Sequence, residues 1–277
     1  MRDSLQIKLE DLRQDQLKEL FLILEEVFST LEIDFYVLGA VARDTWYAKG
    51  DRASRTTRDI DFALYVFSGE MYKKALDNLV SDYGFVENRE IPFNLTTPFG
   101  YTIDLIPFGE LSENDDLLPD NYWDHPVFVS GFEDIFRNAT VPVKVEGEHL
   151  EYKVATLAAI VLLKLIAYDD RPERRTQDPQ DIADIIEAFF DIESEVIYED
   201  HKDLFDRDLE LHEYAAIVIG REIKEILTEN EGLKERIHHI LSLSETTQQR
   251  MAEAMVSGTR TLEQVNRWFA FINEGIQ

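Results

Sequence analysis

Residues 35–66 read FYVLGAVARDTWYAKGDRASRTTRDIDFALYV, and the order of apolar and polar segments in this stretch indicates the fold. A short apolar run, Phe35–Leu38, ends at Gly39, and residues 40–49 that follow have helical character. After a basic, polar loop, a second apolar run begins at Asp59. The order predicts a strand, a glycine turn, a helix and a second strand.

The second predicted strand carries two aspartates separated by one residue, Asp59 and Asp61. Side chains alternate along a strand, so these two carboxylates project from one face, with Ile60 and Phe62 on the other. Two neighbouring carboxylates repel, and a divalent cation with a preference for oxygen ligands, Mg²⁺ or Mn²⁺, relieves that repulsion. In a chain with 56 acidic residues the same pattern also arises by chance at a solvated strand edge.

A third aspartate, Asp104, interrupts the otherwise apolar run YTIDLIPFG at residues 101–109. A buried carboxylate without a partner is costly, so Asp104 needs one. Either an arginine pairs with it, or it is the third carboxylate of a metal site or the base that faces an acceptor hydroxyl.

The loop before the aspartate pair is basic and contains Lys49, Arg52, Arg55 and Arg58. It is either a solvated loop that balances its acidic neighbours or a rim that meets a triphosphate or an acceptor's phosphate.

The second half of the chain has helical periodicity, and residues 154–168 are apolar enough for a core helix that contains Lys164. This lysine either pairs with a buried acid or stabilises phosphate charge near a metal site. Asp178, Asp181 and Asp184 follow at steps of three, along one helical face. Capping chemistry accounts for one of these three acids but not for all of them.

Other expected elements are less distinctive. Periodicity and turn residues predict helices over residues 15–31 and 68–83, short strands over 85–89, 93–97 and 101–108, an edge strand over 141–145, and helices over 212–227, 232–243, 244–256 and 261–274.

Composition limits the classes of function. With 277 residues, 44% of them hydrophobic, the chain can bury a core. The net charge of −28 argues against a broad nucleic-acid surface and against anionic membranes. No apolar run is long enough to span a bilayer. There is no cysteine, which excludes disulfides and thiolate zinc sites, and a cytoplasmic protein is expected.

Two motif regions together resemble the nucleotidyltransferase superfamily of polymerase-beta-like enzymes. In that superfamily a strand–Gly–Gly/Ser–helix unit precedes a strand bearing Asp-x-Asp, as Gly39, Asp59 and Asp61 do here. The later stretch from Lys164 through Arg171 to Asp178 and Asp181 is similar to the Lys-x₆-Arg…Asp-x-x-Asp signature of AbiEii/AbiGii toxin-type nucleotidyltransferases, which are abortive-infection and toxin–antitoxin proteins.

The resemblance implies an α+β protein with two domains. An N-terminal nucleotidyltransferase fold, a mixed sheet flanked by helices, would occupy residues 1–150, and a C-terminal helical domain that completes the active-site cleft would occupy residues 151–277. It also implies transfer of an NMP from an NTP to a hydroxyl of an acceptor, RNA or protein, with magnesium or manganese as cofactor and an antitoxin as partner.

Carried over by position, the resemblance assigns roles to ten residues. Metal ligands are Asp59, Asp61 and Asp104; catalytic residues are these three with Lys164 and Asp181; nucleotide-binding residues are Gly39, Ala40, Arg43, Arg58, Lys164 and Asp178.

The chain departs from the family at Gly39-Ala40, where Gly-Ser or Gly-Gly is common, so one phosphate-binding hydroxyl is missing. Residues 37–44, VLGAVARD, are also similar in part to the Gly-Gly-x-Val-Arg-Asp stretch of CCA-adding enzymes and bacterial poly(A) polymerases. Two other functions stay open: a catalytically idle nucleotide-binding or protein-interaction module of the same fold, and a small-molecule nucleotidyltransferase such as those that modify aminoglycosides.

Overall fold

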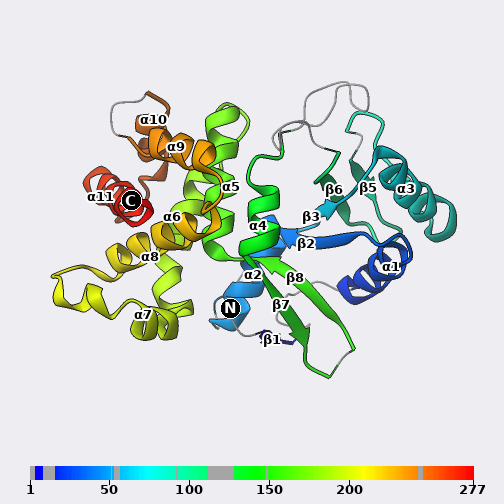
Figure 1. Cartoon of the computed structure of the whole chain (residues 1–277), viewed down its shortest axis with the longest axis horizontal. Coiled ribbons are helices and arrows are strands. Elements are labelled where there is room, and N and C mark those ends of the chain that lie inside the picture. The colour runs from blue at the N-terminus through cyan, green and yellow to red at the C-terminus, as the bar shows by residue number, and fades with distance from the viewer. Residues whose placement is uncertain are drawn as a thin grey trace. The chain divides into compact units, whose positions relative to one another are not determined.

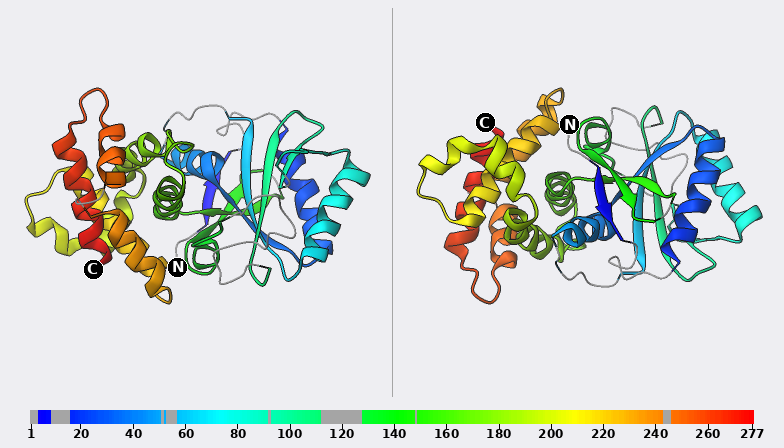
Figure 2. Two further views of the ribbon diagram at one scale, coloured as in Figure 1. Left: turned by 90° about the horizontal axis from the view of Figure 1, so that it is seen from above. Right: turned by 90° about the horizontal axis from the view of Figure 1, so that it is seen from below.

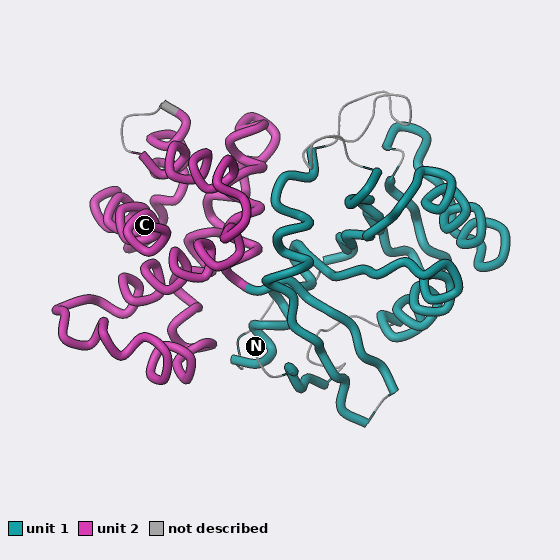
Figure 3. The backbone as a smooth tube through the Cα atoms, in the orientation of Figure 1, with its two compact units in different colours: residues 1–156 teal, residues 157–277 magenta. Residues whose placement is uncertain are grey.

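The computed structural model of the chain describes residues 4–8, 16–50, 52, 57–91, 93–111, 128–147, 149–242 and 246–277. It divides the chain into two compact units, residues 1–156 and residues 157–277 (Figure 3). The division lies after the predicted boundary at residue 150, because residues 151–155 form a strand of the first unit.

The first unit is built on a sheet with eight described strands in the order β1-β7-β8-β2-β3-β6-β5-β4 (Figure 1). The strands are β1 (Leu5–Ile7), β2 (Asp34–Leu38), β3 (Asp59–Tyr65), β4 (Val86–Glu87), β5 (Asn94–Thr96), β6 (Thr102–Phe108), β7 (Thr140–Val145) and β8 (Glu151–Ala155). Parallel pairs (β1–β7, β2–β8, β3–β6) mix with antiparallel ones.

Helices cover both faces of this sheet. Figure 2 shows α1 (Leu17–Thr30) and α3 (Gly69–Tyr83) on one face and α2 (Gly39–Lys49) on the other, where α4 (Phe132–Asn138) also packs. Phe62 of β3 contacts Phe21 of α1 at 5.7 Å between ring centroids. The Tyr36 hydroxyl on the opposite face donates to the Phe132 carbonyl of α4 at 3.1 Å. Alternation along the strands thus decides which helix each side chain meets.

The second unit is helical. Its elements are α5 (Leu157–Asp170), α6 (Asp178–Ile192), α7 (Ser194–Asp200), the 3₁₀ helix η2 (Lys202–Asp206), α8 (Leu211–Ile226), α9 (Glu231–Ile240), α10 (Thr246–Met255) and α11 (Leu262–Ile276). A mixed sheet flanked by helices and followed by a helical region confirms the predicted α+β class. Among the described helices, none combines the length and the apolar character that a membrane crossing requires.

Several predicted element ends agree with the structure. The Ser68 side chain caps α3 by accepting from the Met71 N–H at 3.2 Å, and Gly84 ends that helix with a φ of 73°. Thr261 and Gln264 form a capping box at the start of α11, where the helix over residues 261–274 was predicted. At these two helices, a polar residue that accepts from the first free N–H groups correctly indicates where the helix begins.

Two predictions near residue 150 are wrong. Residues 154 and 155 end β8 instead of beginning a helix, and residues 151–155 alternate between exposed and buried as a strand does. The strand at residues 140–145 is not at the sheet edge, because β1 pairs beyond it with Val143–Val145. Pro142 is tolerated there since the β1 pairing begins one residue after it.

The second unit contains one very close helix crossing, between α8 and α11. A Cβ atom added to Gly220 would overlap the Ile272 carbonyl oxygen, and one added to Gly275 would overlap the Ile217 carbonyl oxygen. The two backbones approach this closely only because both residues lack a side chain.

We expect Gly220→Ala to lower the free energy of unfolding by about 1–3 kcal/mol, because a methyl group forces the two helices apart. Gly232→Ala in α9 is the matched control, since the nearest described atom to its added Cβ is 4.0 Å away. The control should be neutral or stabilising, by about 1 kcal/mol at most, because alanine is the better helix former. Urea denaturation of both variants measures the difference, and equal stabilities would contradict the packing account.

Candidate functional site

Gly39 and Asp61 meet where β2 ends and α2 begins. Leu38, the last residue of β2, pairs with Asp61 of β3, and Gly39 follows with a φ of 66°. A Cβ atom on Gly39 would overlap the Asp61 Oδ2 atom. The carboxylate therefore occupies the space that any other residue at position 39 would need for its side chain, and the left-handed backbone also favours glycine there.

Asp104 lies beside Asp61 on the neighbouring strand. In the parallel pairing of β3 with β6, Asp61 is the partner of Asp104 and Asp59 is the partner of Thr102. Paired residues on adjacent strands, about 4.8 Å apart, share a face, as do residues two apart on one strand. The three predicted carboxylates therefore lie on one face of the sheet, while Ile60 turns to the opposite face and is buried.

The Asp104 side chain is held by a polar network. The Asn94 amide donates to the Asp104 Oδ1 atom at 2.5 Å, and the Asn88 amide donates to the Asn94 Oδ1 atom at 3.1 Å. Asn94 is buried at 7% exposure, so its amide has few other orientations. On the other side of the strand, burial first and the Asp104 and Glu87 charges next raise the pKa of Tyr72 well above its usual value.

The donor chemistry of this face fits a divalent cation, because Asp59, Asp61 and Asp104 offer only carboxylate oxygens. Their side chains are not drawn together, however: within the described residues no three Asp, Glu or His side chains gather closely enough to hold a metal ion. The Asp61 carboxylate lies over Gly39, whereas the Asp104 carboxylate accepts from Asn94. The shared face and the oxygen donors support the site, and the ion would have to draw the side chains inward.

Helix α2 carries three predicted nucleotide-binding residues, Gly39, Ala40 and Arg43. Ala40 lies in its first turn, which contains no acidic residue. The Arg43 guanidinium donates to the Asp44 Oδ1 atom at 2.9 Å, and its carbon lies 5.6 Å from the centre of the Tyr47 ring. Arg43 is thus anchored along the helix by a buried neighbouring acid, a contact that the sequence analysis did not anticipate.

The basic loop is described in part. Lys49 lies over the Trp46 ring at 5.4 Å, and Arg52 lies over the Tyr47 ring at 6.0 Å. Arg58 is exposed directly before Asp59. Arg55 lies outside the described residues. Two of these cations are therefore positioned by aromatic side chains of α2.

In the second unit, Lys164 of α5 meets two acids of α6. Its ammonium donates to the Asp178 Oδ1 atom at 2.8 Å and to the Asp181 Oδ2 atom at 2.7 Å. Asp178 is buried at 7% exposure, and its Oδ2 atom has no hydrogen-bond partner among the described residues. The structure thus brings together Lys164, Asp178 and Asp181, with Lys164 in an ion pair.

Asp184, the third acid of that helical face, has a separate partner. Arg260 contacts the Asp184 Oδ1 atom at 3.2 Å and the Glu187 Oε1 atom at 3.4 Å, and it donates to the Gln180 Oε1 atom at 2.8 Å. Arg260 lies 76 residues beyond Asp184 in the sequence, so no local spacing signalled this contact.

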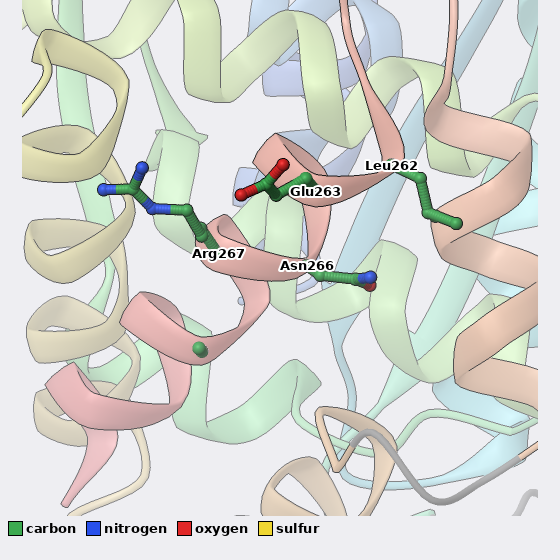
Figure 4. A pocket seen from close by; sticks show the side chains of 5 residues that line it. Leu262, Glu263, Asn266 and Arg267 are labelled. Atoms are coloured by element: carbon green, nitrogen blue, oxygen red, sulfur yellow. The ribbon is translucent and has the colours of Figure 1, made fainter.

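A shallow depression of about 510 Å³ lies on α11, and none of the predicted site residues lines it. Figure 4 shows Leu262, Glu263, Asn266 and Arg267 along this helix. Arg267 is held by the buried Glu213 at 2.5 Å. No nucleophile or acid–base pair faces this depression among its lining residues, so it adds nothing to the candidate site.

No family model matches the chain, and no curated protein matches its sequence. Three solved structures are similar at low identity. An antigenic nucleotidyltransferase-like protein from Paracoccidioides brasiliensis has 15% identity and a TM-score of 0.39, over 65% of this chain and 77% of that one. The antibiotic-resistance factor ANT(2'')-Ia has 12% identity and a TM-score of 0.39, over 70% of this chain and 97% of that one.

The CCA-adding enzyme of Thermotoga maritima, in complex with tRNA, has 12% identity and a TM-score of 0.28, over 96% of this chain and 83% of that one. Likenesses at such scores carry no argument about the activity of the present chain. The functional assignment therefore depends on the residues themselves.

We expect Gly39→Ala to lower the free energy of unfolding by about 2–4 kcal/mol, because the methyl group displaces the Asp61 carboxylate and the left-handed backbone disfavours alanine. Gly147→Ala is the control, with a φ of 76° and no described atom within 4 Å of the added Cβ. It should cost only about 1 kcal/mol, the backbone share of the effect. Denaturant titration distinguishes the two, and matching losses would contradict the close approach of Asp61.

We expect Lys164→Met to lower the free energy of unfolding by about 2–4 kcal/mol, because it leaves the buried Asp178 carboxylate without its cation. Adding Asp178→Leu should recover part of this loss, since both charges are then absent. Lys234→Met is the control because its partner Glu231, at 3.4 Å, has a 71% exposed side chain, and it should change stability by less than about 0.5 kcal/mol. No loss in Lys164→Met would show that the ion pair is not structural.

Proposed function

We propose that this protein is a metal-dependent nucleotidyltransferase that moves an NMP from an NTP to a hydroxyl group of an acceptor. The observation that carries the proposal is the placement of Asp61. It lies over Gly39 at the start of α2, beside Asp104 and on the same face as Asp59. A helix start with free N–H groups, next to carboxylates on one face of the sheet, suits a phosphate–metal substrate.

The reaction is an in-line displacement at the α-phosphorus. The acceptor oxygen forms a bond to this phosphorus, the bond to the bridging oxygen breaks, and pyrophosphate leaves with the electron pair of that bond. Asp104 is the residue we assign to receive the acceptor's proton. The free N–H groups in the first turn of α2, from Gly39 onward, would hold phosphate oxygens.

A divalent cation held by Asp59, Asp61 and Asp104 would supply Lewis-acid stabilisation of the transferred phosphoryl group. The chain itself would supply carboxylate oxygens from the paired strands β3 and β6. The Asn94 amide fixes one of these ligands through its hydrogen bond to Asp104.

The role predicted for Lys164, stabilisation of phosphate charge, stays a prediction. An ammonium has three N–H donors, and Asp178 and Asp181 accept two of them. In this account the two acids orient the lysine, so Asp178 and Asp181 act through it.

The acceptor is an RNA or protein hydroxyl in our proposal. With a net charge of −28, contact with RNA would be local and would involve the basic segment from Lys49 to Arg58. The similarity to AbiEii-type proteins supports a toxin role with a cognate antitoxin, for which growth arrest on expression is the corresponding phenotype.

A second candidate function is nucleotide binding without catalysis. It is favoured by the separation of the three carboxylates and by Ala40 in place of the family's serine or glycine. Under this alternative the protein binds an NTP in the presence of Mg²⁺ but releases no pyrophosphate with any acceptor.

Replacing Asp61 by asparagine should abolish NMP transfer, by at least about a thousandfold, because a ligand and a negative charge are lost from the reacting centre. The measurement follows each α-labelled NTP, incubated with Mg²⁺ and total cellular RNA and protein, together with released pyrophosphate. Asp34→Asn is the matched control, since Asp34 is exposed at the other end of β2, opposite Tyr65.

Loss of transfer in Asp61→Asn with full transfer in Asp34→Asn supports the proposal, provided both variants melt like the parent protein. Full transfer by Asp61→Asn would refute the assignment. Nucleotide binding by the parent protein with no labelled product in any fraction would favour the non-catalytic module.

A further inference from the structure

Four aromatic rings form a connected cluster on the surface of the second unit. Tyr198 stacks on Phe205 at 5.1 Å and 6°, and Phe205 stacks on Tyr214 at 5.3 Å and 30°. Phe190 closes the ring of contacts, at 5.9 Å from Tyr198 and 6.1 Å from Tyr214. The cluster joins α6, α7, η2 and α8, and we call it the aromatic patch.

Two members of the aromatic patch are open to solvent. Tyr198 is 53% exposed and Phe205 is 38% exposed, whereas Tyr214 is buried at 8%. Half-buried Phe190 and buried Tyr214 contact the exposed rings, and the Tyr214 hydroxyl is fixed by donating to the Arg207 carbonyl at 3.1 Å. Stacked rings keep few rotamers, so a partner that covers them loses little side-chain entropy on binding.

Acidic side chains flank the exposed rings. The segment 191–210 contains nine Asp and Glu residues and only two Lys and Arg residues. Exposed Glu195 and Glu199 flank Tyr198 on α7, and exposed Asp206 follows Phe205. The segment's only arginine, Arg207, is paired with Glu274 at 2.5 Å, and Arg221 neutralises Asp203 at 2.9 Å. The remaining charge around the rings is negative.

We propose that the aromatic patch binds a basic, amphipathic segment of a protein partner. Apolar side chains of that segment would lie on Tyr198 and Phe205, and its Lys and Arg side chains would pair with Glu195, Glu199 and Asp206. Rigid aromatic side chains at the centre of an interface supply most of the affinity, and the charged rim supplies rate and specificity.

The negative charge around the aromatic patch favours a basic protein segment over a nucleic acid and over a second copy of this chain. A nucleic acid would bring phosphates against the acidic rim, where binding normally depends on basic side chains. A second copy of this chain, with a net charge of −28, would be repelled. The proposal does not depend on the transferase activity, because none of the proposed catalytic residues belongs to the patch.

Fluorescence anisotropy of a labelled 14-residue peptide, with leucine and lysine at helical spacing, tests the proposal on the full chain. Tyr198→Ser and Phe205→Ser should each weaken binding about tenfold or more, as central aromatic residues do. Tyr198→Phe keeps the ring and should bind like the parent. Val256→Ser is the control, since Val256 is a 42% exposed apolar residue elsewhere in this unit. A peptide with glutamate in place of lysine should not bind.

Thermal melting of each variant confirms that the fold is retained. Equal peptide affinity in the parent and in both serine variants, or no binding by the parent protein, would overturn the proposal. Binding of single-stranded RNA that either serine variant abolishes would also overturn it, as would a dimer in sedimentation that either variant dissociates.

Discussion

The Asp61 carboxylate fills the space above Gly39, and this one close approach links three elements of the first unit. It marks the end of β2, the start of α2 and the middle of the acidic face of β3. An acid at this place is compatible with the fold because the start of a helix carries partial positive charge. The opposite face of β3 is apolar and packs under α1, so the strand can bear carboxylates on one side only.

In the second unit, many Lys and Arg side chains form ion pairs with Asp and Glu carboxylates. Lys164, Arg236 and Arg260 each contact two carboxylates. Such clusters connect α5 with α6 and α9, and α6 with the segment before α11. The segment from Lys49 to Arg58 is the part of the first unit with a local basic surplus, and this is why we assign contact with an acceptor's phosphates to it. The acidic side chains around Tyr198 and Phe205 favour a basic protein partner, because opposite charges attract.

Local patterns predicted the centre of the first unit well. The order of β2, α2 and β3, and the common face of Asp59 and Asp61, follow from alternation and from one glycine, which are short-range properties. The apolar run around Asp104 predicted strand β6. Its parallel pairing with β3, and the register that places Asp104 beside Asp61, could not be predicted. The apolar run that continues from β8 into α5 predicts a helix from Val154, whereas residues 154 and 155 are the last two of β8.

Contacts between residues far apart in the chain could not be predicted from the sequence. The hydrogen bond from Asn94 to Asp104 depends on the pairing of β5 with β6, and the contact of Arg260 with Asp184 depends on the packing of helices far apart in the chain. The sequence allowed Lys164 to pair with a buried acid but did not identify Asp178 and Asp181 as its partners. The geometry, with one ammonium between two carboxylates, came from the structure.

The most direct measurement is anomalous diffraction from crystals of the full chain soaked with Mn²⁺ and a non-hydrolysable NTP. The account predicts an anomalous peak in contact with Asp61 and at least one of Asp59 and Asp104, with the nucleotide's phosphates at the start of α2. A Mn²⁺ ion and nucleotide bound elsewhere, with these carboxylates bare at saturating Mn²⁺, would contradict it.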